Sequence, residues 1–250
     1  MSWVETPSMS FVARHESTQA REAELVLDDL ERFRSELELV IDRVPGEVAV
    51  IIHPRPLMLF LAHPWLPLIR FVSAPAGRRY FAGFYGRREI HVLAPPALEE
   101  RGSGVPGSRE ALLLTPRHEY AHLAFGAANP SLPPPFTPGT FRRYVRMAWV
   151  SEGAATYFAG QVVHMRGAVA RRLREGGRPA FPPGPRDALV LGGTVFALLA
   201  SEHGDGPCVE LALSRSPVAA AGVLEKAFDR PLASIQNSWT DYLAAFVSAA

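Results

Sequence analysis

Prolines and glycines divide this chain of 250 residues into a mixed first half and a helical second half. Three segments of the first half have the composition of strands: residues 7–14, residues 47–52, and two short apolar runs within 80–93 that suit a hairpin. Residues 18–41 carry apolar side chains at helical spacing among many charges, which predicts a long amphipathic helix. We therefore expect a first half that combines strands with helix.

Helical patterns dominate the second half. The expected helices cover residues 111–125, 141–158, 187–203, 208–228 and 232–248. Thr115 and Pro116 mark either the start of the first of these helices or a kink within it, and Gly126 marks its end. The proline-rich segments at 127–140 and 176–185 are expected to be loops.

The most apolar segment, residues 56–71, predicts a buried and broken helical segment. It is interrupted by His63, Pro64, Pro67 and Arg70. These interruptions leave no continuous apolar stretch of the length that a membrane-spanning helix needs. We therefore expect no membrane span here.

Composition and charge exclude several classes of function. A formal net charge of +1 gives no overall field that would attract nucleic acid or an acidic membrane surface. Cys208 is the only cysteine, which excludes an intramolecular disulfide and a thiolate-rich zinc site. The first residues lack the features of a secretory signal, so a cytoplasmic location is the default expectation. The sequence does not indicate an oligomeric state.

The segment HEYAHLAFG at 118–126 has the spacing of a zinc site. His118 and His122 lie four residues apart in a helical context, so both imidazoles project from one face and can bind one metal ion. Glu119 lies between them, where its carboxylate can accept a proton from water. The alternative interpretation is a surface helix with two solvent-facing histidines, and a third ligand is needed to decide between them.

Glu152 is the candidate third ligand. It lies in the segment AWVSEGAATYFAG at 148–160, which is otherwise apolar and rich in small residues and would normally exclude a carboxylate. A buried carboxylate needs a cation or a metal as its partner. Gly153, Ala154 and Ala155 would allow this helix to approach another helix closely, as a shared metal would require.

The two motifs together resemble the gluzincin zinc metallopeptidases. HExxH is followed by WxxEGxA, here Trp149 to Ala155, as in the peptidase MA-like family and, more distantly, aminopeptidase N and thermolysin. The resemblance implies an α+β, zincin-like fold, with a small twisted N-terminal sheet packed on an active-site helix and a helical C-terminal subdomain. Residues 1–250 would form one catalytic unit, with a mixed half at 1–126 and a helical half at 141–250.

The same resemblance implies hydrolysis of peptides or proteins. Zinc would be held by His118, His122 and Glu152, with Glu119 as the general base. The sequence lacks the Gly-Ala-Met-Glu-Asn segment with which aminopeptidases bind a free amine, which favours endopeptidase or specialised activity. Thr156 stands where the thermolysin branch has an aspartate that orients a ligand.

The residue that stabilises the oxyanion is not evident from the pattern. Many relatives carry a tyrosine near the start of the helix that corresponds to 187–203, but this chain has apolar residues and glycine at 189–192. The best-placed substitutes are Tyr144 and Arg143, which lie between the proline-rich loop and the Glu152 helix. A role as rim or packing residues is the alternative for both.

The remaining histidines are assigned structural or surface roles, because none has a partner at ligand spacing. They are His15, His53, His63, His91, His164 and His203. His91 is singled out because it would lie on the strand bordering the cleft. The arginines between 166 and 178 lack interleaved aromatic residues, so nucleic-acid binding is not expected.

Two other functions stay open at this point. The first is a binding module that has kept the gluzincin scaffold with weak or no catalytic turnover. The second is a hydrolase that acts on a non-peptide amide or ester, because a metal and a base do not select the acyl compound.

Overall fold

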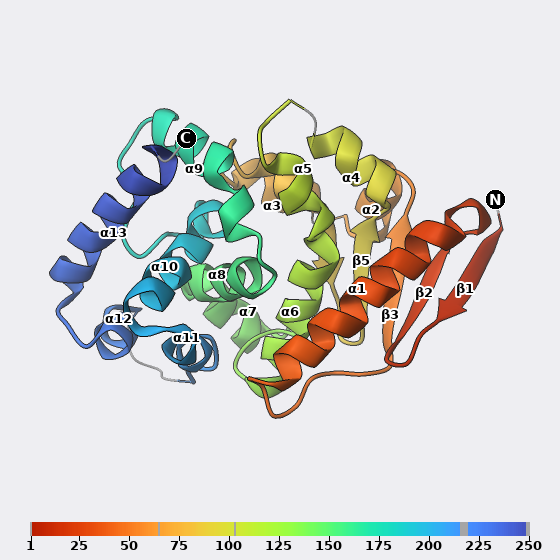
Figure 1. Cartoon of the computed structure of the whole chain (residues 1–250), viewed down its shortest axis with the longest axis horizontal. Helices are drawn as coiled ribbons and strands as arrows, with labels where there is room; N and C mark the ends of the chain where they lie inside the picture. The colour runs from red at the N-terminus through yellow and green to blue at the C-terminus, as the bar shows by residue number, and fades with distance from the viewer. Residues whose placement is uncertain (1, 65, 103, 216–219, 249–250) are drawn as a thin grey trace.

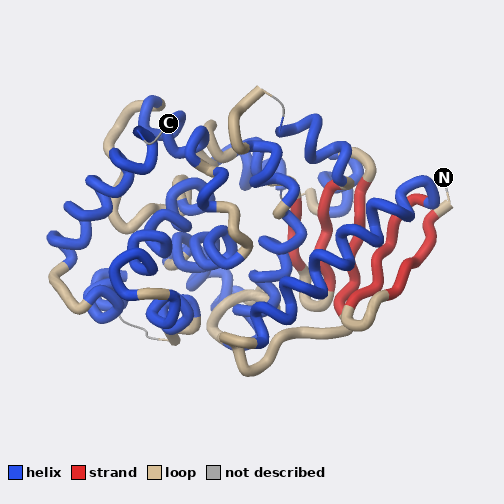
Figure 2. The backbone as a smooth tube through the Cα atoms, in the orientation of Figure 1, coloured by secondary structure: helices blue, strands red, loops and turns tan. Residues whose placement is uncertain are grey.

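The chain folds into a small mixed sheet at its N-terminal end, followed by a largely helical remainder (Figures 1 and 2). This computed structural model describes residues 2–64, 66–102, 104–215 and 220–248. Within them the sheet has five strands in the order β1-β2-β3-β5-β4. The strands are β1 (Trp3–Pro7), β2 (Phe11–Glu16), β3 (Val48–His53), β4 (Gly83–Tyr85) and β5 (Glu89–Leu93). The expected α+β class with an N-terminal sheet is confirmed.

The centre of the sheet is parallel and its two edges are antiparallel. β2, β3 and β5 run in one direction, while β1 pairs with β2 and β4 pairs with β5 in the opposite sense. The expected single strand at 7–14 is wrong, because the chain turns after Pro7 and forms β1 and β2 on either side of the turn. The Glu31 carboxylate fixes this turn by accepting hydrogen bonds from Ser8 Oγ at 2.7 Å and from Ser10 N at 2.6 Å.

One face of the sheet packs against α1 (Ala20–Glu38) and α6 (Thr115–Ala128). The structure confirms three expected elements: the strand at 47–52, the hairpin within 80–93 and the long helix at 18–41. A short 3-10 turn, η1 (Ser17–Gln19), precedes the helix. Figure 1 shows α1 lying across β1 to β3. Buried aromatic side chains pack between the sheet and these helices. The rings of Phe11 on β2 and Tyr120 on α6, for example, meet edge to face with their centroids 4.9 Å apart.

The other helices gather beyond the sheet. They are α4 (Pro95–Gly102), α5 (Ser108–Leu113), α7 (Pro138–Arg146), α8 (Ala148–Phe158), α9 (Arg166–Arg174), α10 (Ala188–His203), α11 (Asp205–Ala212), α12 (Ala220–Phe228) and α13 (Leu232–Ser248), with 3-10 turns η2 (Arg78–Tyr80) and η3 (Val162–His164). None of the described helices is both long and apolar enough to cross a membrane.

Several expected helices are divided in the structure. The pattern at 111–125 is broken at Leu114, so that Thr115 and Pro116 begin α6, which then runs past Gly126 to its end at Ala128. The expected helix at 141–158 is interrupted at Met147 between α7 and α8. The segment 208–228 is likewise not one helix, and its residues 216–219 lie outside the described part of the chain.

The apolar segment at 56–71 forms two short helices, α2 (Pro56–Ala62) and α3 (Leu66–Val72). The expected break is confirmed, but the expected burial is wrong. Leu59 and Leu66 are buried, whereas Leu61 is 73% exposed and Phe71 is 71% exposed. A helix of two turns packs only one side against its neighbours, so the remaining apolar side chains of this segment face solvent.

α8 and α10 approach closely enough for their backbones to touch. A Cβ atom added to Gly153 would lie 2.7 Å from the carbonyl carbon and oxygen of Gly192, and one added to Gly192 would lie 2.7 Å from Trp149 O. The glycine next to Glu152 therefore serves the contact with α10. The expected close approach of Gly153 to another helix is therefore made with α10, while α8 also packs on α6, the helix that carries His118 and His122.

Three histidines that the sequence left without partners meet on the face of the sheet opposite α1. His53 Nε2 lies 3.0 Å from His91 Nδ1, and the His63 ring at the end of α2 meets the His91 ring at 4.1 Å. Burial lowers the pKa of His53 and of His63 to about 4, and the charge of His91 acts in the same direction. Burial also lowers the pKa of His91, although Glu89 Oε1, 3.6 Å from its Nε2, opposes this.

This cluster should make the fold less stable in mild acid. Because the pKa values are lowered in the folded state, the unfolded chain takes up more protons than the folded chain between about pH 6.5 and pH 4. Stability is therefore complete above this window and falls as the pH falls through it. We expect the cluster to lower the free energy of unfolding, measured with urea, by roughly 1–3 kcal/mol between pH 7 and pH 5.

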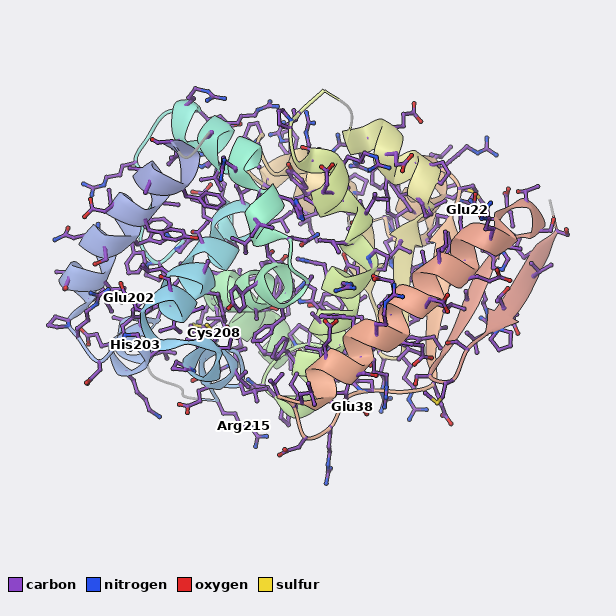
Figure 3. All side chains as sticks on the ribbon, in the orientation of Figure 1. Glu22, Glu38, Glu202, His203, Cys208 and Arg215 are labelled. Atoms are coloured by element: carbon purple, nitrogen blue, oxygen red, sulfur yellow. The ribbon has the colours of Figure 1, made fainter. Side chains whose placement is uncertain are left out.

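The matched variants are His63→Gln and His203→Gln. The first removes one member of the cluster and should reduce the dependence of stability on pH. His203 is exposed at the end of α10, far from the sheet (Figure 3), so its replacement should leave that dependence unchanged. An identical pH dependence in both variants would contradict the assignment to the cluster.

Candidate metal centre

Two helices bring the three expected ligands together. α6 presents His118 and His122 one turn apart, with their Nε2 atoms separated by 3.2 Å. α8 contributes Glu152, whose Oε2 lies 3.4 Å from His118 Nε2 and whose Oε1 lies 3.6 Å from His122 Nε2. All three side chains are largely removed from solvent, and that of Glu152 is 12% exposed.

These distances suit a zinc ion. Zinc bonds of about 2.0–2.1 Å in tetrahedral geometry place neighbouring ligand atoms roughly 3.3 Å apart. Among the described residues, His118, His122 and Glu152 are the one group of at least three His, Cys, Asp or Glu side chains whose ligand atoms lie within 4.8 Å of one another. Three protein ligands leave a fourth position for water or substrate, as in catalytic zinc sites.

Hydrogen bonds fix the two imidazoles in the form that can bind a metal. Gln161 Nε2 donates to Ala111 O at 2.8 Å, so its Oε1 faces His118 Nδ1, also at 2.8 Å. His118 therefore carries its proton on Nδ1 and keeps the Nε2 lone pair free. Ser151 Oγ lies 3.3 Å from His122 Nδ1 and likewise accepts a hydrogen bond from that nitrogen, which leaves the Nε2 lone pair of His122 free.

Neither of these supporting residues was expected from the sequence. Ser151 lies within the second motif, and Gln161 follows Glu152 by nine positions, between α8 and η3, where no ligand pattern marks it. At Thr156, where the resemblance would place an orienting aspartate, the buried Oγ1 has no partner among the described residues. Gln161 thus supports the ligand histidine from a different place in the chain.

Glu119 lies beside the ligands against strand β4. The strand passes so closely that a Cβ atom added to Gly83 would lie 2.5 Å from Glu119 Oε1. Burial raises the pKa of Glu119 to about 8, with His118 lowering it and Glu152 raising it. Glu152 differs: burial would raise its pKa, but the charge of His122 and the hydrogen bonds of both imidazoles keep its pKa below the ordinary value.

Two tyrosine hydroxyls reach the same centre. Tyr144, on α7, donates a hydrogen bond to Glu152 Oε1. Tyr85, on β4, stacks its ring on His122 with ring centroids 4.3 Å apart, and its buried hydroxyl lies beside Ser151. Burial, followed by the charge of Glu152, raises the pKa of both phenols well above the ordinary value, so both remain donors at neutral pH.

The cleft beside the ligands is mainly apolar. Leu66, Ile69, Phe84, Phe136, Phe141 and Leu189 contribute to its walls. Leu189, at the start of α10, is one of these wall residues, and no tyrosine stands at 189–192. Arg143, the other expected donor, is not among the wall residues and donates a hydrogen bond to Ser214 O at 2.9 Å. His91, which was expected to border the cleft, belongs to the histidine cluster.

Two comparisons of the chain with known proteins found no match. No protein-family model matches it, and a search of curated proteins found no similar sequence. The geometry and the two motifs therefore carry the functional interpretation.

Proposed function

We propose that this chain is a zinc-dependent metallohydrolase of the gluzincin type, most simply a peptidase. The observation that carries the proposal is the convergence of His118, His122 and Glu152 from two helices, with the non-ligand carboxylate of Glu119 beside them. The order HExxH then WxxEGxA, and a sheet packed on the HExxH helix, support the same assignment. The zincin-like identity of the fold is part of this proposal.

The side chains would divide the chemistry between them. A zinc ion held here would lower the pKa of water and polarise an acyl carbonyl. The positive charge of such an ion would lower the pKa of the neighbouring Glu119 carboxyl, so that its carboxylate would accept a proton from water and return it to the leaving amine. Gln161 and Ser151 hold the two imidazoles in place, and the apolar walls of the cleft exclude competing water.

Metal analysis tests the site directly. We expect the purified chain to hold about one zinc ion, as a single open site requires. Alanine at His118, His122 or Glu152 should weaken zinc binding by roughly a hundredfold or more. Mutating a residue that only hydrogen-bonds to a ligand already lowers metal affinity by roughly ten- to a hundredfold. His164→Ala, outside the site, is the control. Zinc content that is unchanged in all three ligand variants would refute the proposed centre.

Tyr144 is our candidate for the donor to the oxyanion, in which role its hydroxyl would transfer its hydrogen bond from Glu152 Oε1 to the substrate oxygen, and Tyr85 is the competing candidate. Tyr144→Phe should lower kcat roughly tenfold to a thousandfold with zinc still bound at saturation, as the loss of one such hydrogen bond does. Tyr85→Phe should preserve kcat within a few fold, because its ring keeps its stacking on His122. The opposite pattern would transfer the role to Tyr85.

A further inference from the structure

Exposed apolar side chains concentrate around the cleft. More than half of the exposed large hydrophobic residues in the described chain lie on α2, on α3 or between Phe136 and Arg146. Leu57, Leu61, Leu68 and Phe71 are between 59% and 73% exposed, and Phe141 is 52% exposed. Single exposed apolar residues are ordinary, but a concentration of this kind marks an interaction surface.

Two of these three segments contribute residues to the cleft walls, and the third, α2, directly precedes α3 in the chain. α3 contributes Leu66 and Ile69, while the second segment contributes Phe136 and Phe141. Their exposed side chains therefore border the mouth of the cleft. We call α2, α3 and residues 136–146 together the rim.

The rim lies in two stretches of sequence that contain no acidic residue. Residues 48–88 include six arginines, and residues 120–151 include three more, without a single aspartate or glutamate. The formal net charge of +1 conceals this separation, because the acidic residues lie elsewhere in the chain. The distribution of charge, which the net charge cannot reveal, gives the rim a basic character.

Several arginines in or beside the rim form no ion pair with a carboxylate of the described residues. Arg55, Arg142 and Arg146 are exposed, and within the described chain neither they nor Arg70 form an ion pair with a carboxylate. Behind α3, burial and then the charges of Arg70 and Arg79 lower the pKa of Arg101 to about 10. Positive charge thus accumulates beside the exposed apolar side chains.

We propose that the rim docks on the surface of a lipid bilayer with anionic headgroups, with the cleft mouth facing the lipid. Apolar side chains between arginines fit such an interface, since the former enter the acyl boundary and the latter bind phosphate. A second copy of the chain fits less well, because a two-fold contact would set the rim arginines of the two copies against each other. Docking does not depend on the proposed hydrolysis, but together they imply substrates held at a membrane surface.

Vesicle flotation tests the docking on the full chain. Wild-type protein should float with vesicles of phosphatidylcholine and phosphatidylglycerol at low salt, and much less with phosphatidylcholine alone. Leu68→Ser/Phe71→Ser should weaken binding roughly tenfold or more, because two exposed apolar side chains are lost from the interface. Each arginine near an anionic surface strengthens binding by about fivefold, so Arg142→Gln/Arg146→Gln should also weaken vesicle binding by roughly tenfold or more.

Matched variants remove equally exposed groups away from the rim. Met9→Ser/Leu39→Ser replaces side chains that are 89% and 85% exposed, and Arg21→Gln/Arg43→Gln removes two exposed arginines. Both should bind like the wild type, and circular dichroism should show that all variants are folded. The proposal is overturned if the wild type ignores anionic vesicles, if the two rim variants bind no worse than the controls, or if the rim variants instead abolish a dimer seen by sedimentation.

Discussion

Glu119→Gln is expected to keep its zinc and to lose most of its hydrolytic activity. Glutamine preserves the shape of a buried side chain that lies against Gly83, but it cannot accept a proton from water. General-base catalysis contributes roughly a hundred- to ten-thousandfold to rate, so kcat should fall by a factor in that range. Zinc content and initial rates on a peptide library, measured on the same preparations, separate metal binding from chemistry.

The matched control is Glu110→Gln. Glu110 is an exposed glutamate on α5, so its replacement should change neither zinc content nor rate. Half of the library should be acetylated, because the missing amine anchor predicts that a blocked N-terminus will not abolish cleavage. Equal rates for Glu119→Gln and the wild type would remove the general-base role while leaving the metal assignment intact.

Gly153→Ala is expected to destabilise the fold beside the site. Alanine is the better helix former by about 1 kcal/mol, but its methyl group would meet the backbone of Gly192 at 2.7 Å. Overpacking of this kind costs about 1–3 kcal/mol or more, and backbone atoms cannot move aside as a flexible side chain can. We expect a net destabilisation of roughly 1–3 kcal/mol in urea unfolding, with weaker zinc binding because the adjacent Glu152 is displaced.

Gly206→Ala provides the comparison for this effect. Gly206 lies in α11, and a Cβ atom added there meets nothing within 4 Å. This variant should be as stable as the wild type or slightly more stable, because only helix propensity changes. A Gly153→Ala protein that gains as much stability as Gly206→Ala would show that the two helices do not require the close contact.

Local patterns in the sequence predicted much of the fold and all three candidate ligands. α1 and β3 follow from the spacing of apolar residues, and HExxH places His118 and His122 on one face of a helix. The break at Met147 was missed because no proline or glycine marks it. The burial of residues 56–71 was wrong because apolar composition does not tell which helix faces find a partner.

Features that depend on tertiary contacts could not be predicted in the same way. Gln161 is an ordinary polar residue until the fold places its amide between Ala111 and His118. The histidine cluster arises because β3 and β5 pair in register and α2 returns over them, which brings together His53, His63 and His91. Neither relation has a fixed spacing along the chain.

The ligand helices belong to different parts of the molecule, since α6 packs on the sheet and α8 packs on α10. A bound ion would therefore act as a cross-link between the sheet layer and the helical layer. Ligand binding to the folded state alone stabilises it by about 2.7 kcal/mol when the free ligand is a hundredfold above its dissociation constant. The lifetime of the folded chain would then follow the free zinc concentration around it, so metal supply would set the abundance of the protein as well as its activity.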